Sequence, residues 1–464
     1  MIRQRSTTLV AFLLAVTLVP VAAPHDAALA TPGGGTAAVR PQCPRSQPDT
    51  VRAVASARAC LGRVEDLSSK SETTQVFAEP DGSRTAEIHT GVVRVKDEHG
   101  VWRDVDLNLS RRADGSIASK VHPNGLVLAG PAGAGEHDLA VLGTGDEQVA
   151  VGWRGRLPEP VLDGTKATYA EAMPGVDLVI EVTRSGFESF LVVKDRAAAA
   201  QVASVAMPMR TGALSARPSG GGYDLTDRAG KVRGRLSAAY MWDATIHPVS
   251  GEPARRVPVG LTTRTTGAGR TDLVLTPDAA FLADPKTEYP VVIDPQWDIW
   301  VLGGYHDTWV QSDGATGWNS EELKVGTYNG GGVVARSFLM FDTAPFFGTY
   351  VHWATLHMYE TWAYSCRDAE WQTWVSEYFD YTTNWWNQPP WHAYVNSSSE
   401  TTGYDYCEGD GWVNIDATGF FQVAADSGYP YYTLGLIAGL EWHNDSWKRF
   451  RSSDSSWGLS LIHI

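Results

Sequence analysis

A glycine-rich stretch, Asn329 to Gly332, suggests chemistry directly, because backbone N–H groups in such loops can bind phosphate. A phosphate-binding loop needs a lysine and a serine or threonine after its last glycine, with a helix behind them. Here the residues that follow, Val333 to Phe341, are β-branched and aromatic, which favours a strand. Asn-Gly is a frequent hairpin turn because both residues tolerate positive φ. The stretch therefore predicts two strands joined by a glycine turn, with Arg336 paired to Asp342 or Asp307.

Motifs for other chemistry are missing from the sequence. There is no H-E-x-x-H and no G-x-S-x-G, and although carboxylates are plentiful, no spacing singles out a glycosidase pair. The 12 histidines lack metal-ligand spacing, which favours surface positions on strands. The acidic turn Asp313–Glu322 could hold a structural calcium, but it lacks EF-hand spacing and a solvated loop is favoured. We therefore expect no catalytic residue, no metal site and no cofactor, and hence a protein that is not an enzyme.

Tryptophan is the residue in real excess, and 15 of the 18 tryptophans lie at or beyond Trp297. Large aromatic side chains can fill a sandwich core, and Trp353, Trp412 and Phe338 fit that role on alternating strands. The stretch Thr382–Trp391 contains two consecutive prolines, so its tryptophans are expected on a loop. Exposed ring faces could stack there on sugar rings. The expected sugar-binding residues are Trp318, Trp385, Trp386, Trp391 and Tyr394.

The N-terminus has the features of an export signal. Arg3 and Arg5 precede an apolar run, Leu9 to Ala23, and Ala28-Leu29-Ala30 is a cleavage site, so residues 1–30 are predicted to be a signal peptide. No later run is apolar for long enough to cross a bilayer. The mature protein is therefore expected to be secreted, either released or held at the cell wall.

The four cysteines fit an oxidising compartment. No two of them have C-x-x-C spacing, which argues against a zinc or redox site. The simplest of the three possible pairings joins Cys43 to Cys60 and Cys366 to Cys407.

The elements that must position these residues are strands throughout. Residues 31–72 are rich in Ala, Pro, Gly and Ser, and read as a linker with a possible short helix over 51–67. Residues 73–295 alternate apolar and polar positions between turn residues, which predicts β-sandwich structure. A Gly/Ser/Pro break at 217–222 could divide this region into two lobes. The change to a tryptophan-rich composition marks a second β-domain over 296–464. The predicted fold class is all-β, built from β-sandwiches.

Charge is concentrated in that second domain. From Gln296 onward there are 20 acidic and six basic residues, which accounts for −14 of the net charge of −15. An acidic surface repels phosphate backbones, so nucleic acid is not expected as a partner.

Six motifs stand in order across 300–455: Asp307–Val310, Leu323–Gly326, Arg336–Asp342, Ala354–Tyr359, Thr383–Pro389 and Trp412–Thr418. Together they resemble the DNRLRE domain. The resemblance implies a jelly-roll-like sandwich, grouped with carbohydrate-binding modules of secreted bacterial proteins, that binds glycans without catalysis. The sequence departs from that pattern at Trp457–Ile464, as expected for a truncated domain.

A second set of segments lies in the region 73–295: Thr85–His89, Val151–Arg154, Ala167–Tyr169, Pro174–Val179, Phe187–Asp195 and Tyr289–Pro295. Through them the region is similar to the N-terminal part of actinobacterial wall-associated and Rhs-type secreted proteins. In those proteins such segments precede a long repeat barrel and a variable toxin, whereas this sequence reaches Ile464 with neither.

The leading hypothesis is a secreted, non-catalytic protein that binds polysaccharide or cell wall through its aromatic domain. The first alternative is the structural or delivery part of an Rhs-type toxin. The second is a glycoside hydrolase with unrecognised carboxylates.

Overall fold

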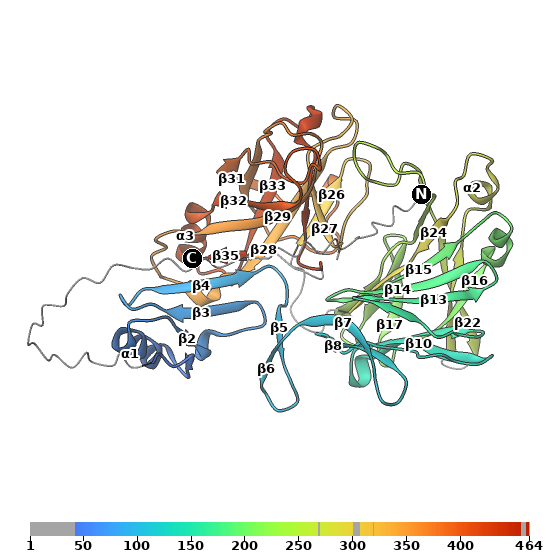
Figure 1. The fold of residues 1–464 in the computed structure, drawn as a ribbon, viewed down its shortest axis with the longest axis horizontal. Helices are drawn as coiled ribbons and strands as arrows, with labels where there is room; N and C mark the ends of the chain where they lie inside the picture. Colours follow the sequence, from blue (N-terminus) through green and yellow to red (C-terminus); the bar gives the residue numbers. More distant parts are fainter. Residues whose placement is uncertain (1–41, 268–269, 300–306, 319, 456–460, 464) are drawn as a thin grey trace, which may run out of the picture.

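The computed structural model describes residues 42–267, 270–299, 307–318, 320–455 and 461–463. Over these residues it confirms the all-β class, because strands form two β-sandwiches and helices are short (Figure 1). The predicted signal peptide lies outside the described residues. Within them, no helix is both long enough and apolar enough to cross a membrane.

The first sandwich is formed by strands between residues 106 and 299. One sheet has the order β22-β23-β16-β11-β10-β9-β8-β7, and the other has the order β12-β13-β14-β15-β25-β19-β18-β17 with β24, β20 and β21 joined to it. The strands of the first sheet are β7 (Asp106–Arg111), β8 (Ile117–Val121), β9 (Val127–Leu128), β10 (Glu136–Leu142), β11 (Val149–Arg154), β16 (Val205–Arg210), β22 (Gly260–Gly267) and β23 (Arg270–Thr276). Those of the second are β12 (Val161–Asp163), β13 (Lys166–Met173), β14 (Val176–Val182), β15 (Gly186–Val193), β17 (Ser215–Ser219), β18 (Gly222–Thr226), β19 (Val232–Leu236), β20 (Tyr240–Trp242), β21 (Arg256–Pro258), β24 (Val291–Asp294) and β25 (Gln296–Ile299).

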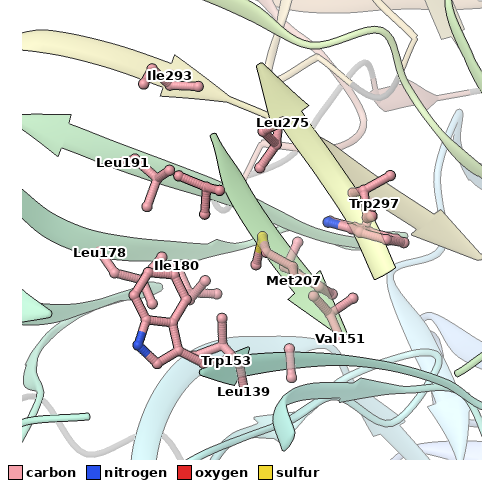
Figure 2. Packing of buried hydrophobic residues seen from close by; sticks show 14 of the residues in the cluster. Leu139, Val151, Trp153, Leu178, Ile180, Leu191, Met207, Leu275, Ile293 and Trp297 are labelled. Atoms are coloured by element: carbon pink, nitrogen blue, oxygen red, sulfur yellow. The ribbon is translucent and has the colours of Figure 1, made fainter. Parts of the chain in front are cut away.

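Alternating apolar residues fill the space between these two sheets. On β14, Leu178 and Ile180 are fully buried, as the two-residue period of a strand requires. Figure 2 shows them facing Trp153 and Met207 of the opposite sheet. The helix α2 (Ala279–Ala283) lies at the end of this sandwich.

The second sandwich combines the two ends of the chain. Its larger sheet has the order β1-β2-β3-β4-β35-β29-β34-β27, with β32 on the other edge of β29, and its smaller sheet has the order β26-β28-β33-β30-β31. The larger sheet contains β1 (Ser46–Gln47), β2 (Val64–Asp66), β3 (Thr74–Ala78), β4 (Arg84–His89), β27 (Glu322–Val325), β29 (Thr355–Ala363), β32 (Gly411–Asp416), β34 (Lys448–Arg451) and β35 (Leu461–His463). The smaller contains β26 (Asp307–Gln311), β28 (Ala335–Asp342), β30 (Trp371–Ser376), β31 (Trp391–Ser398) and β33 (Tyr431–Ala438).

Two helices accompany this sandwich. Helix α3 (Thr418–Ser427) buries Phe420 and Phe421 in its core. Helix α1 (Thr50–Cys60) packs beside β2 and β3, and begins at Asp49, whose side chain accepts a hydrogen bond from the Arg52 N–H.

The sandwiches do not follow the predicted boundaries at 72/73 and 295/296. Strands β3 and β4 bury Val76 and Ile88 in the second core, and β35 lies between β4 and β29 (Figure 1). Strand β25, in contrast, belongs to the first sandwich, where Trp297 is buried. Over its described part, the predicted linker instead contains α1, β1 and β2, and the break at 217–222 is a hairpin turn between β17 and β18.

The two strands on either side of the glycine turn, β27 and β28, do not form the hairpin that the sequence predicted. Strand β27 pairs with β34, whereas β28 pairs with β26 and β33 in the other sheet. The two segments touch at the bridge between Gly326 and Ala335. They also touch through the Ser337 hydroxyl, which accepts from the Lys324 N–H and donates to the Lys324 carbonyl. The turn therefore passes between the two layers of the sandwich, because each strand finds its ladder partner elsewhere.

Both expected disulfides are present. Cys43 and Cys60 have Cα atoms 5.1 Å apart, and Cys366 and Cys407 have Cα atoms 5.9 Å apart. The first fastens α1 to the segment before it, and the second joins the loop between β29 and β30 to the loop between β31 and β32.

Candidate functional site

The tryptophan-rich loop, residues 377–390, covers the outer face of the smaller sheet. On β28, Leu339 and Phe341 point into the main core, so Phe338 and Met340 point outward. The loop buries these two side chains under Phe379, forming a small second core.

The loop is held by its own polar side chains. Its short 3-10 helix, η5 (Trp385–Asn387), begins at Asn384, whose side-chain oxygen accepts from the Trp386 N–H at 2.9 Å. The Asn384 N–H in turn donates to the Asn387 side chain at 2.6 Å. This reciprocal capping fixes the backbone of the short helix that carries Trp385 and Trp386.

Three of the five predicted sugar-binding residues support the fold. Trp318 is only 8% exposed, and its ring lies 5.7 Å from that of Phe379. The Trp391 ring lies 5.1 Å from that of Phe338 and covers Gly435, where an added Cβ would come within 2.3 Å of the indole. Trp385 is half-buried against the same cluster.

The other two predicted residues are accessible. Trp386 is 73% exposed and lies against Gly314, while Tyr394 is 50% exposed and meets Trp374 edge-on with ring centroids 5.6 Å apart. The structure thus places the five predicted residues in two environments, three in the small core and two at the surface.

Arg336 does not pair with Asp342 or Asp307, as the sequence suggested. Its guanidinium donates to both carboxylate oxygens of Glu441, at 2.7 and 2.8 Å, and to the Gln388 side chain at 3.2 Å. It also lies 4.8 Å from the centre of the Trp385 ring. Arg336 therefore joins β28 to the segment after β33 through a charge-assisted bidentate contact with Glu441. It holds the tryptophan-rich loop through Gln388 and Trp385.

The two aspartates have structural positions of their own. Asp307 is buried and accepts from the Ser453 N–H at 2.7 Å, and burial raises the pKa of Asp307 to about 6. Asp342 accepts from the Ala344 N–H at 3.1 Å, and burial raises its pKa.

Two tryptophans assigned to the core are instead exposed. Trp353 and Trp412 are 52% and 51% exposed, whereas Phe338 is buried as predicted. Trp412 meets Tyr359 of the neighbouring strand with ring centroids 5.2 Å apart, and Arg451 lies 4.1 Å above Tyr359. The outward position of Trp412 could have been predicted from the sequence. The aliphatic residues Val413 and Ile415 take the inward positions of β32, so Trp412 points outward.

Sequence reasoning also missed a buried ion pair. Lys448 Nζ donates to Glu360 at 2.9 Å, and both side chains are completely buried. Lys448 also donates to the Thr401 hydroxyl at 2.9 Å, while Glu360 accepts from the Thr402 N–H at 2.9 Å. Burial raises the pKa of Glu360 and lowers the pKa of Lys448. The pair holds the loop that follows β31.

No chemical centre can be assigned to the described residues. They contain no group of three or more His, Cys, Asp or Glu side chains placed to hold a metal ion. The described residues do provide an exposed aromatic surface at Trp386 and Tyr394, next to a loop whose backbone is held by hydrogen bonds.

No protein-family model matches the chain. Its resemblance to the DNRLRE domain therefore stays a prediction. Among curated proteins, the chain is 22% identical over 431 residues to the tRNA nuclease WapA of Bacillus subtilis strain 168. It is 23% identical over 434 residues to the tRNA(Glu)-specific nuclease WapA of Bacillus subtilis subsp. natto. In both cases the match covers 86% of this chain and 18% of the relative.

These relatives contradict two predictions. Proteins named as tRNA nucleases are enzymes that act on nucleic acid, so the expectations of no enzymatic activity and no nucleic-acid partner are wrong. The charge argument failed because it used the surface of a region that spans less than a fifth of these relatives. The match favours the Rhs-type alternative, and nothing in it supports polysaccharide binding.

Proposed function

We propose that this chain is the structural and delivery region of an exported Rhs-type toxin whose activity is of the tRNA nuclease class. The observation that carries the proposal is the extent of the match, because 86% of the chain aligns with the tRNA nuclease WapA. An alignment of this extent includes strands of both sandwiches.

The junction of the two sandwiches suits a rigid scaffold. A hairpin of the first sandwich, residues 246–253 and here called the latch hairpin, docks on the second. The Ser250 carbonyl accepts from the Trp447 indole at 3.2 Å and from Arg449 at 3.3 Å, and the Val249 carbonyl accepts from the Trp362 indole at 3.0 Å. Such a junction would hold attached segments in a fixed relation.

Export is part of the proposal. Two disulfides lie in the described residues, and disulfides persist in oxidising compartments. The sequence of residues 1–30 has the pattern of a signal peptide.

A chimera tests this function. The region of the Bacillus subtilis relative that matches this chain is replaced by residues 42–464, and the chimera is expressed beside recipient cells. We expect the chimera to leave the producing cells and to cause tRNA cleavage in the recipients, to the extent measured for the unaltered relative in the same assay. The control deletes the matching region. A chimera that behaves like the deletion would refute the proposal.

Glycan binding is a second candidate function, favoured by the exposed rings of Trp386 and Tyr394. Retention of the whole chain on insoluble wall polysaccharide, compared with a Trp386→Ala/Tyr394→Ala variant, tests it. Equal retention of the two proteins would remove this candidate.

A further inference from the structure

A cleft of about 360 Å³ opens between the two sandwiches. The first sandwich contributes the ends of β17 and β19 together with β20 and β21, and the second contributes the turn around Gly314 and the start of the tryptophan-rich loop. This volume lies at the lower end of the range of small-molecule sites, roughly 300–1,000 Å³. It would accommodate a compound with a single sugar ring.

Two arginines, Arg235 and Arg256, line this cleft together with one carboxylate, Asp294, although the chain carries a net charge of −15. The Arg235 Nε lies 3.8 Å from the Asp224 carboxylate, so its charge is already balanced. Arg256 is therefore the arginine whose charge a ligand can meet.

The two arginines are fixed in different ways. Arg235 donates to the Tyr381 carbonyl at 3.0 Å and so bridges the two sandwiches. Arg256 is exposed, its guanidinium lies 3.8 Å above the Tyr240 ring, and it makes no ion pair among the described residues. Stacking on the ring holds the Arg256 fork in place while its N–H groups remain available to a ligand.

Hydroxyl groups complete the lining. Ser237 comes from the first sandwich and Thr316 from the second, and each hydroxyl can donate one hydrogen bond. An arginine fork with neighbouring hydroxyls matches a group that presents several acceptor oxygens around one centre, as a phosphate does. A neutral sugar would leave the arginine charge unmatched.

We propose that this cleft binds a small phosphate monoester, of the size of a single sugar phosphate, with Arg256 as its main anion contact. The inference goes beyond the proposed function and does not rest on it. A ligand held here would touch both sandwiches, so its binding would also stabilise their junction.

The test is titration calorimetry of the whole chain with glucose 1-phosphate, inorganic phosphate and glucose at low ionic strength. We expect heat of binding with glucose 1-phosphate and with inorganic phosphate, and none with glucose. The Arg256→Gln variant should bind glucose 1-phosphate at least about tenfold more weakly, since a hydrogen bond to a charged group is lost. The matched control is Arg228→Gln, because Arg228 is an exposed arginine in the turn at the other end of the β18–β19 hairpin.

Three results would overturn the proposal: no binding of glucose 1-phosphate to the unmodified chain, equal binding by Arg256→Gln, or equally tight binding of glucose. An Arg256→Lys variant guards against a misfolded glutamine variant, because it keeps the charge but not the fork. It should bind with intermediate affinity and unfold at the temperature of the unmodified chain.

Discussion

At the scale of single residues, the buried pair of Lys448 and Glu360 joins two strands of the second sandwich, β34 and β29. Two fully buried charges lie 2.9 Å apart and are satisfied by neighbouring hydrogen bonds. Such a pair adds little stability over an apolar pair of similar volume. Removing one partner, however, leaves the other charge buried without a counter-charge.

We therefore predict that Glu360→Ala lowers the free energy of unfolding by about 3–5 kcal/mol, measured by urea denaturation. The matched control is Lys120→Ala, which breaks the exposed pair with Asp106 and should cost less than about 1 kcal/mol. A double variant, Glu360→Leu with Lys448→Met, should recover most of the loss. Equal effects of the Glu360 and Lys120 substitutions would contradict this account.

A second residue-scale prediction concerns pH. Burial, together with the nearby charge of Glu181, raises the pKa of Glu321 to about 7 from an ordinary value of 4.5. Below pH 4.5 the carboxyl is protonated in both the folded and the unfolded chain, and above pH 7 it is charged in both. The folded state therefore loses stability as the pH rises from 4.5 to 7.

Glu321→Gln removes that loss. We expect the variant to be more stable than the unmodified chain by roughly 1–3 kcal/mol at pH 8 and nearly equal to it at pH 4, measured by thermal or urea unfolding. Glu98→Gln, at an exposed turn, should show no such dependence on pH. A stabilisation of the Glu321 variant that is the same at both pH values would argue against a titrating carboxyl.

At the scale of elements, the sequence predicted the kind of structure better than its connections. Alternation and turn residues correctly indicated strands throughout, since both are local properties of a strand and its ends. They could not indicate that β27 pairs with β34 or that Arg336 meets Glu441, because these contacts join residues far apart in the chain.

The exposure of individual tryptophans was hard to predict for the same reason. The two prolines correctly suggested a loop at Trp385 and Trp386, but only the outer face of β28 explains why one ring is covered and the other is free. The position of Trp412 was predictable from its aliphatic neighbours, and its misassignment came from treating aromatic size as evidence of burial.

The packing of Trp391 on β33 gives a test at this scale. Gly435→Ala would place a Cβ within 2.3 Å of the indole, so we predict a loss of about 1–3 kcal/mol in the free energy of unfolding. Gly419→Ala is the control, because Gly419 lies in helix α3 with open space around it and the change should be neutral or slightly stabilising. Tryptophan fluorescence followed during denaturation provides the measurement. A Gly435 variant as stable as the unmodified chain would show that the ring can move aside.

At the scale of the whole molecule, the latch hairpin connects the two sandwiches. Glu252 of this hairpin lies 2.9 Å from Lys324 and 3.8 Å from Arg449 of the second sandwich. Burial opposes the ionisation of Glu252, but these two cations lower its pKa below the usual value. The sequence predicted neither the exact limits of the two sandwiches nor this junction, since the residues involved come from three separate segments.

We predict that Glu252→Ala separates the unfolding of the two sandwiches. Calorimetry of the unmodified chain should give one transition, and the variant should give two, because two cations at the junction lose their shared carboxylate. Glu98→Ala should leave a single transition. A single transition in the Glu252 variant, shifted or not, would show that the remaining contacts suffice.

The position of strand β35 between β4 and β29 determines when the larger sheet can be completed during synthesis. The N-terminal strands β3 and β4 leave the ribosome first, yet one edge of β4 receives its partner only when residues 461–463 have been made. Until then that edge offers unpaired N–H and C=O groups, which invite pairing with other chains. A chain that was exported unfolded would not expose this edge during synthesis. Both ends of the chain would then be available together, and β4 and β35 could pair in a single folding step.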